Sequence, residues 1–265
     1  MDDPLTIKDV ESAKIKRKND VVERWSGMAS QGHGIKEFRG DSLCNQWLYR
    51  PYLLRSSRFK TAMQLRTNTI GIKTILSRAG GGPDVACRHC HAWPETLAHV
   101  LGQCTATKDA RIHRHDEIVG IVAEALAHES RRVEKEPSIT IGGVTWKPDI
   151  VLYDRVKRKV NVYDVTIRYE RDDALLEAAR EKISKYKDVA KFLADEAQYK
   201  RWQVFPIVLG SRGAIPLITR QVLQDVGFGK KDLLSMSLMA LRSSIEISHA
   251  FLDYVQGRRG RRRGD

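Results

Sequence analysis

The sequence predicts an α/β (α+β) protein in which a mixed sheet is flanked by helices, preceded by a helical segment and a small module rich in cysteine and histidine. Three observations lead to this prediction. Two runs of strand length, at 148–154 and 159–168, are rich in β-branched and aromatic residues. A long amphipathic helix from residue 172 to about 197 follows them and leads to another apolar run at 202–209. Three of the four cysteines lie close together between residues 87 and 104.

The first part of the chain, residues 1–82, is expected to be a helical linker segment. Apolar residues recur at helical spacing at Val21, Trp25 and Met28. Further helices are predicted near 42–54, 57–67 and 71–78. The run Gly80-Gly81-Gly82-Pro83 then breaks the chain, which places a boundary at about residue 82.

The next segment, residues 83–107, carries a metal-ligand pattern. Its four candidate ligands are separated by two, eight and four residues, the short-long-short spacing of a four-ligand zinc site, and are Cys87, Cys90, His99 and Cys104. Three thiolates and one imidazole leave no open position on the metal, so the expected Zn²⁺ is structural. A segment this short has little apolar surface to bury and needs the metal to fold. His89 or His91 is the alternative histidine ligand.

The largest module is expected over residues 108–256. A helix is predicted at 108–128, and strands follow it at 138–145, 148–154 and 159–168. After the long helix and the strand at 202–209, two helices near 216–226 and 230–255 complete the module. The tail, residues 257–265, is composed almost entirely of arginine and glycine and is expected to be disordered.

Two aspartates occur where strands of a buried sheet are predicted. Asp149 precedes the run 150–153, and Asp164 lies within 159–167, whose apolar residues occupy both alternating faces. The polar turn at 154–158 makes the two strands a hairpin. A buried carboxylate is costly unless it is paired, neutralised or bound to a metal. Both acids are therefore predicted to serve a working site, the plainer alternative being that each ends a strand and pairs with a nearby cation.

The helix that follows is predicted to bring an amine to the same place. Lys182 and Tyr186 are one turn apart and share a face of the helix, although Lys185 and Lys187 are alternatives for the lysine. Phosphodiester hydrolysis adds negative charge to the phosphate, which Mg²⁺ held by one or two carboxylates offsets. A lysine then orients or deprotonates the attacking water or stabilises the charged state. In the usual nuclease pattern this lysine follows the second acid by two residues, a position held here by Thr166.

These motifs closely resemble the restriction-like endonuclease of site-specific non-LTR retrotransposons that insert into ribosomal DNA. The resemblance spans most of the chain and rests on Lys147-Pro148-Asp149 and on the segments 47–68, 87–116, 164–170 and 181–187. It implies a restriction-endonuclease-like core of the PD-(D/E)xK type, preceded by a CCHC zinc knuckle. In that family the lysine has moved from the strand to the next helix, which reconciles Thr166 with Lys182.

The resemblance also implies roles for individual residues. Asp149 and Asp164 are expected to be catalytic acids that bind Mg²⁺ or Mn²⁺, with Lys182 as the displaced catalytic lysine and Tyr186 as its supporting partner. A further acid is sought in Glu170 or Glu177. Contacts to nucleic acid are expected from Arg111, Arg114, His115 and Lys147.

The implied function is a divalent-metal-dependent endonuclease that nicks duplex DNA to prime reverse transcription. The chain is expected to be the C-terminal part of a larger polyprotein, with duplex target DNA, the element's RNA and an upstream polymerase domain as partners. It is not expected to polymerise DNA itself, because no pair of aspartates between two apolar strands precedes the knuckle.

Composition agrees with a polyanionic partner, because 46 Lys and Arg against 33 Asp and Glu give a formal charge of +13. No apolar run approaches a membrane span and no signal peptide is apparent, so an intracellular, nuclear location without membrane contact is expected. Two other functions compete: a nucleic-acid-binding zinc module with an inactive nuclease-like fold, and a zinc-stabilised interaction domain. Binding alone has no use for acids in the sheet, which favours the nuclease.

Overall fold

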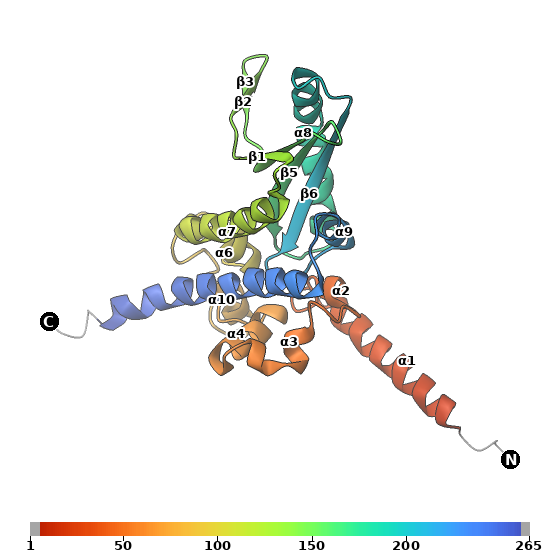
Figure 1. Ribbon diagram of the computed structural model, residues 1–265. Helices are drawn as coiled ribbons and strands as arrows, with labels where there is room; N and C mark the ends of the chain where they lie inside the picture. The colour runs from red at the N-terminus through yellow and green to blue at the C-terminus, as the bar shows by residue number, and fades with distance from the viewer. Residues whose placement is uncertain (1–5, 261–265) are drawn as a thin grey trace.

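A four-stranded mixed sheet forms the centre of the computed structural model, which describes residues 6–260, with side chains described up to residue 253. The strand order is β1 (Arg131–Lys135), β4 (Ile150–Asp154), β5 (Lys159–Arg168) and β6 (Arg201–Gly210). The first two pairs are antiparallel, and β5 and β6 run parallel. The predicted α/β class, with a mixed sheet flanked by helices, is confirmed (Figure 1).

Helices cover both faces of the sheet. The parallel pair β5 and β6 needs a crossover connection, which α8 (Ala174–Glu196) supplies on one face. Val160 and Val162 of β5 pack in a cluster with α8, whereas Tyr163 and Val165 pack with α7 (Lys108–Leu126) and α9 (Leu217–Asp225) on the other face. Because side chains alternate along β5, the face on which a residue lies decides which helices it contacts.

A further hydrophobic core lies below the sheet in Figure 1, where α10 (Lys230–Gly260) crosses the molecule. Buried residues from three parts of the chain meet there: Trp47 and Leu65 from the N-terminal segment, Leu97 from the cysteine-rich segment and Ile245 from α10. The main core beneath α7 also includes Phe38 and Cys44. The N-terminal segment is thus packed into the same body as the sheet.

The N-terminal part of the chain is helical, and α4 (Ser56–Arg66) matches the helix predicted near 57–67. The first helix, α1 (Ile7–Ser26), has no buried residue and projects from the body (Figure 1). The others are α2 (Ile35–Phe38), α3 (Gln46–Tyr49), the 3-10 turn η1 (Pro51–Leu53), α4 (Ser56–Arg66), α5 (Lys73–Arg78), α6 (Leu97–Gly102) and the 3-10 turn η2 (Thr105–Thr107). The single helix predicted over 42–54 is wrong, because α3 ends at Tyr49 and Pro51 starts a separate turn.

The strand predicted at 138–145 is also wrong. That segment folds back on itself as β2 (Ile139–Ile141) and β3 (Val144–Trp146), a separate two-stranded sheet. Gly142 and Gly143 form its turn with φ of 56° and 82°, values that favour glycine. The main sheet instead has β1 as one of its two edge strands, which the sequence pattern did not indicate.

The end of the chain differs from the prediction in one respect. Residues 257–260, predicted to begin a disordered tail, belong to α10, and residues 261–265 lie outside the described part of the chain. Within the described residues, no helix combines the length and the apolar character needed to cross a membrane.

Candidate active site and metal centre

Strand register brings the two predicted acids together. Ile150 pairs with Tyr163 and Val151 with Val162, so continuing the antiparallel register sets Asp149 opposite Asp164. The Val165 backbone N–H donates a hydrogen bond to Asp149 Oδ2 at 2.6 Å, which ties the first acid to the second strand. Side chains alternate along β5, so Asp164 points to the same face as Val162, the face covered by α8.

The predicted lysine meets the second acid. Lys182 Nζ lies 2.7 Å from Asp164 Oδ2, and these side chains are 16% and 2% exposed. Burial, and next the charge of Asp149, raise the pKa of Asp164 above its ordinary value, even though Lys182 opposes the shift. The carboxylate therefore still favours added positive charge.

Tyr186 supports the same site from one turn further along α8. Its hydroxyl donates a hydrogen bond to the Lys147 carbonyl oxygen at 2.9 Å, which fixes the chain just before Asp149. Burial, followed by the nearby charge of Asp164, raises the pKa of Tyr186, so the phenol stays protonated. Of the rival lysines, Lys185 places its ammonium 4.6 Å from the centre of the Tyr186 ring, and Lys187 is exposed.

His115 joins the site from α7, a placement that the sequence analysis did not foresee. Its Nε2 lies 3.3 Å from Asp149 Oδ2 and its Nδ1 3.0 Å from Asp116 Oδ1. The hydrogen bond to Asp149 is the main cause that raises the pKa of His115 to about 9, against the opposing effect of burial. His115 was expected to contact nucleic acid, and nothing in the pattern of α7 indicates that it faces an acid from another element.

The structure assigns neither candidate for a third acid to the aspartate pair. Glu170 is fully buried and pairs with Arg212, whose Nε lies 3.0 Å from Glu170 Oε2. Glu177 is exposed in the first turn of α8. Two aspartate carboxylates still fit Mg²⁺ or Mn²⁺, since such ions take oxygen ligands and Mg²⁺ commonly keeps several waters when held by one or two carboxylates.

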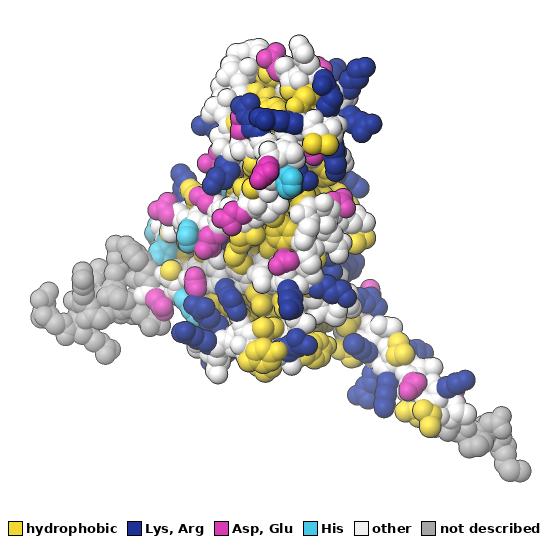
Figure 2. All heavy atoms as spheres, in the orientation of Figure 1, with side chains coloured by type: hydrophobic (Ala, Val, Ile, Leu, Met, Phe, Trp, Pro, Cys, Tyr) yellow, Lys and Arg dark blue, Asp and Glu magenta, His cyan; other side chains and the backbone are white. Residues whose placement is uncertain are grey.

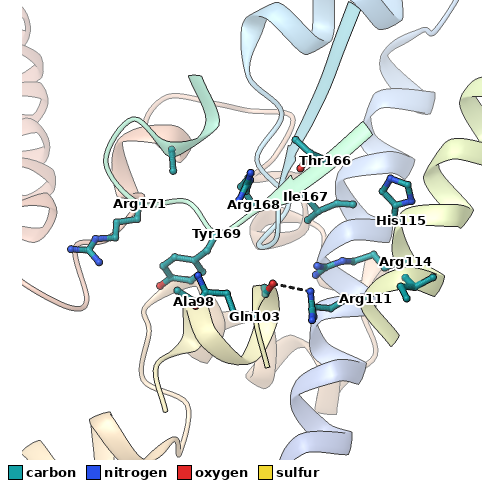
Figure 3. A pocket seen from close by; sticks show the side chains of 13 residues that line it. Ala98, Gln103, Arg111, Arg114, His115, Thr166, Ile167, Arg168, Tyr169 and Arg171 are labelled. Atoms are coloured by element: carbon teal, nitrogen blue, oxygen red, sulfur yellow. Dashed lines mark hydrogen bonds between the residues drawn. The ribbon is translucent and has the colours of Figure 1, made fainter. Parts of the chain in front are cut away.

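A cleft of about 520 Å³ lies between the cysteine-rich segment and His115, the residue that contacts Asp149, although Asp149, Asp164 and Lys182 do not line it (Figure 3). Residues of α6, α7, β5 and the β5–α8 connection line it, among them Arg111, His115, Thr166, Arg168, Tyr169 and Arg171. Arg168 and Arg171 are 47% and 63% exposed and pair with Glu181 and Asp172. The sequence analysis did not select these two arginines, because their position on a cleft follows from the packing of α7 beside β5.

The four residues predicted to contact nucleic acid are placed differently from one another. Arg111 is half-buried and donates hydrogen bonds to the carbonyl oxygens of Gly102 and Cys104, at 2.8 and 3.1 Å. Arg114 is 2% exposed and donates to the Leu101 carbonyl oxygen and to Ser244 Oγ, which joins α6, α7 and α10. Lys147 is exposed, and His115 contacts Asp149 as described.

The four predicted zinc ligands form one compact group. The ligand atoms of Cys87, Cys90, His99 and Cys104 all lie within 4.8 Å of one another. Thr96 caps α6 by accepting from the His99 backbone N–H, which sets the histidine in the first turn of that helix. The donor set of three sulfurs and one imidazole suits Zn²⁺, so this group can bind zinc.

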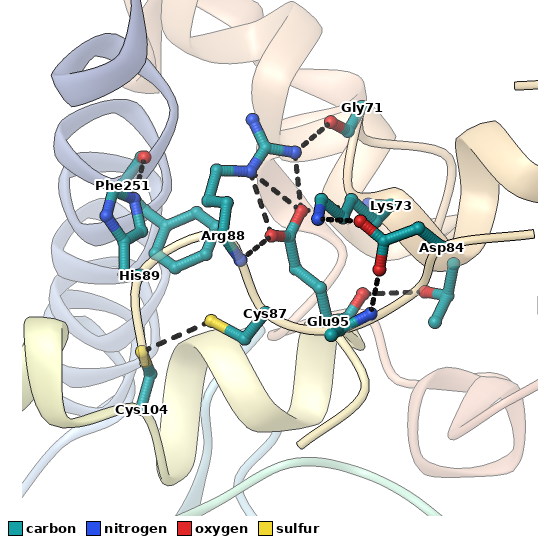
Figure 4. A network of polar contacts seen from close by, with 11 residues as sticks. Gly71, Lys73, Asp84, Cys87, Arg88, His89, Glu95, Cys104 and Phe251 are labelled. Carbon is teal, nitrogen blue, oxygen red and sulfur yellow. Dashed lines mark hydrogen bonds and ion pairs between the residues drawn. The ribbon is translucent and has the colours of Figure 1, made fainter. Parts of the chain in front are cut away.

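The alternative histidines lie elsewhere. His89 Nε2 is 2.8 Å from the Phe251 carbonyl oxygen, and His91 is exposed. A buried ion pair supports the loop that carries the cysteines (Figure 4). There the fully buried carboxylate of Glu95 accepts hydrogen bonds from the Arg88 backbone N–H and guanidinium and from the Lys73 backbone N–H. These hydrogen bonds connect the loop that carries the candidate zinc ligands to the start of α5.

Comparison with known proteins identifies homologues of most of the chain. No protein-family model matches it. Two proteins of Popillia japonica described as "Retrovirus-related Pol polyprotein from type-1 retrotransposable element R2" are 28% and 30% identical, each over 69% of this chain. A protein of the same description from Bradysia coprophila is 24% identical over 68% of this chain. The aligned regions cover 38%, 30% and 21% of these relatives, so the chain spans less than two fifths of their length.

Proposed function

We propose, from its homology to the Pol polyproteins of R2 non-LTR retrotransposable elements, that this chain is a divalent-metal-dependent endonuclease that nicks duplex DNA. The alignment is consistent with a C-terminal region of such a polyprotein. The observation that carries the proposal is the convergence of Asp149, Asp164 and Lys182 on the α8 face of the sheet. An acid-bearing hairpin, a helix and a parallel strand in this order also support a restriction-endonuclease-like core.

Asp149 and Asp164 would hold Mg²⁺ or Mn²⁺, an ion that offsets charge on a phosphodiester and lowers the pKa of a bound water. The Lys182 ammonium stands beside Asp164, where it can orient the attacking water or stabilise the extra charge on the phosphate. Tyr186 and His115 help to position the acids. Tyr186 donates a hydrogen bond to the Lys147 carbonyl oxygen, and His115 lies 3.3 Å from one carboxylate oxygen of Asp149.

The cleft supplies the cations for the DNA backbone. Arg168 and Arg171 line it and are partly exposed, and His115, which also lines it, contacts Asp149. Contacts of this kind read phosphates rather than bases, so binding is expected to weaken steeply with salt. Lysine and arginine side chains are also spread widely over the visible face of the molecule (Figure 2).

The same homology supports the larger setting of the proposal. It is consistent with an upstream polymerase domain in the same polyprotein. We further propose that the nick primes reverse transcription by that domain, with element RNA as template and in the nucleus. The group of three cysteines and one histidine would hold Zn²⁺ as a structural ion.

A nicking assay tests the proposal. Supercoiled plasmid is incubated with the protein and Mg²⁺, and DNA affinity is measured separately in Ca²⁺. Asp149→Ala, Asp164→Ala and Lys182→Ala are each expected to lower the nicking rate by about 100-fold or more, with DNA affinity changed by less than about 3-fold. Lys187→Ala, an exposed lysine on the same helix, is the matched control and is expected to nick like the wild type.

The competing function is a binding module with an inactive nuclease-like fold. It is favoured by one observation, that Lys182 and His115 already pair with the two acids. Wild-type protein that binds DNA tightly but produces no nicks with either Mg²⁺ or Mn²⁺ would establish that function instead.

A further inference from the structure

The β2–β3 hairpin stands apart from the four-stranded sheet (Figure 1). Its register pairs Ile139 with Trp146 and Ile141 with Val144, so these four side chains share one face. The base of that face is anchored, because Ile139 is buried and the Trp146 ring packs edge-on to Tyr186, with ring centres 6.4 Å apart. Toward the tip, Val144 is 54% exposed.

The hairpin is uncharged in a highly charged chain. Charged residues make up 30% of the sequence, yet 137–146 contains none. Exposed Glu136 and Lys147 border this neutral segment directly, and exposed Lys135 precedes Glu136, so the base of the hairpin carries two lysines and one glutamate. The other face carries Thr140 and Thr145, which are exposed and share a hydrogen bond at 3.1 Å. A neutral ribbon whose base has a net positive charge suits a ligand whose charged backbone borders an uncharged interior.

The hairpin is also fixed relative to the acids. Trp146 leads directly into Lys147, whose carbonyl oxygen accepts the Tyr186 hydroxyl hydrogen, and two residues later the chain reaches Asp149. Val144 precedes Asp149 by five residues, at most about 17 Å of extended chain. At about 3.4 Å per base pair this reach corresponds to about five base pairs of DNA.

We infer that the β2–β3 hairpin is a DNA-contacting ribbon that enters the major groove within about five base pairs of the cleaved phosphate. This inference rests on the proposed function for its substrate. A two-stranded β-ribbon fits the major groove, where Val144 would meet base edges or thymine methyl groups, while Ile141 stays packed against the cluster under α8. Lys135 and Lys147 would contact phosphates at the groove's edges.

A charge placed at the tip tests this contact. Val144→Asp is compared with Leu217→Asp, which changes an equally aliphatic and 70% exposed residue on α9, on the opposite face of the sheet. Val144→Asp is expected to weaken duplex binding at least 10-fold, with zinc content and thermal stability like those of the wild type. Leu217→Asp is expected to bind within 2-fold of the wild type. Equal affinities for the two variants would overturn the inference.

A photo-crosslink locates the contact and separates this inference from the proposed nuclease activity. A benzophenone amino acid at position 144 is expected to crosslink to base positions within about five base pairs of the nick, or at a fixed place on the duplex if the protein only binds. A protein that crosslinks but never nicks contradicts the nuclease and supports the ribbon. A protein that nicks but gives no crosslink from position 144 contradicts the ribbon alone. Loss of a protein dimer in Val144→Asp without loss of DNA affinity would assign the hairpin to a second copy of the chain and also overturn the inference.

Discussion

At the scale of single residues, the site is found where side chains break the pattern of their own element. On α8, the apolar Ile183 is 38% exposed, whereas its neighbour Lys182 is turned toward the sheet and pairs with Asp164. An amine on the buried side of a helix and an acid 2% exposed in a strand each cost free energy alone, and together they compensate. The usual preference of charged side chains for solvent is not followed at this pair, as is expected at a functional site.

Tyr186 offers a test at this scale. Tyr186→Phe keeps the ring that packs against Trp146 but removes the hydroxyl that donates to the Lys147 carbonyl. The free energy of unfolding is expected to fall by about 1 kcal/mol, the usual net contribution of one hydrogen bond. The nicking rate is expected to fall about 10-fold, because Asp149 follows the freed carbonyl. Stability from urea unfolding and rates from the plasmid assay check both, and an unchanged nicking rate would show that the hydroxyl does not position the acid.

At the scale of elements, strands that pack on a core were predictable and an exposed edge strand was not. The residues of β1 are mostly charged, Arg131-Arg132-Val133-Glu134-Lys135, so it lacks the apolar alternation that marks a strand. Charges of this kind protect a sheet edge from pairing with other chains. The dipeptide Gly142-Gly143, by contrast, is a recognised hairpin signal that would have divided the strand predicted at 138–145.

The cysteine-rich segment gives the prediction for this scale. Elemental analysis of the folded protein is expected to find about one zinc per chain, and Cys104→Ser is expected to lose it. Because Cys87, Leu97 and Val100 share a core with α10, metal loss should unfold more than the segment itself. Far-ultraviolet circular dichroism during chelation measures this as a loss of helix. A fully helical protein without bound metal would contradict a structural role for zinc.

At the scale of the whole molecule, buried charges join the N-terminal segment to the sheet. Arg212 and Glu170 are both fully buried, and the Arg212 guanidinium also donates hydrogen bonds to the carbonyl oxygens of His33 and Arg66. Arg66, itself 4% exposed, stacks its guanidinium 3.4 Å from the centre of the Phe38 ring. Glu170 lies between β5, which carries Asp164, and α8, which carries Lys182. The N-terminal segment thus helps to hold the connection between the strand that carries Asp164 and the helix that carries Lys182.

Deletions test this dependence. Removal of residues 1–24 takes away most of α1. None of the residues of this helix is buried, so the melting temperature should stay nearly unchanged. Removal of residues 1–72 should prevent cooperative folding, because it strips buried partners from Arg212. Breaking a buried charged network costs about 3–5 kcal/mol, a large part of an ordinary domain's stability. Differential scanning calorimetry compares the two proteins, and a cooperative transition in the longer deletion would show that the sheet folds without the N-terminal segment.

The sequence by itself determined the α/β class and selected the candidate zinc ligands and the two candidate acids, Asp149 and Asp164. Each choice depends on local spacing or on a residue type that is costly to bury in a strand. Only the tertiary structure decided that Lys182 rather than Lys185 or Lys187 meets Asp164, that His115 faces Asp149 and that Arg114 is buried. Those outcomes depend on how α7 and α8 are rotated and placed against the sheet. The packing of residues distant along the chain sets that placement, and no local pattern records it.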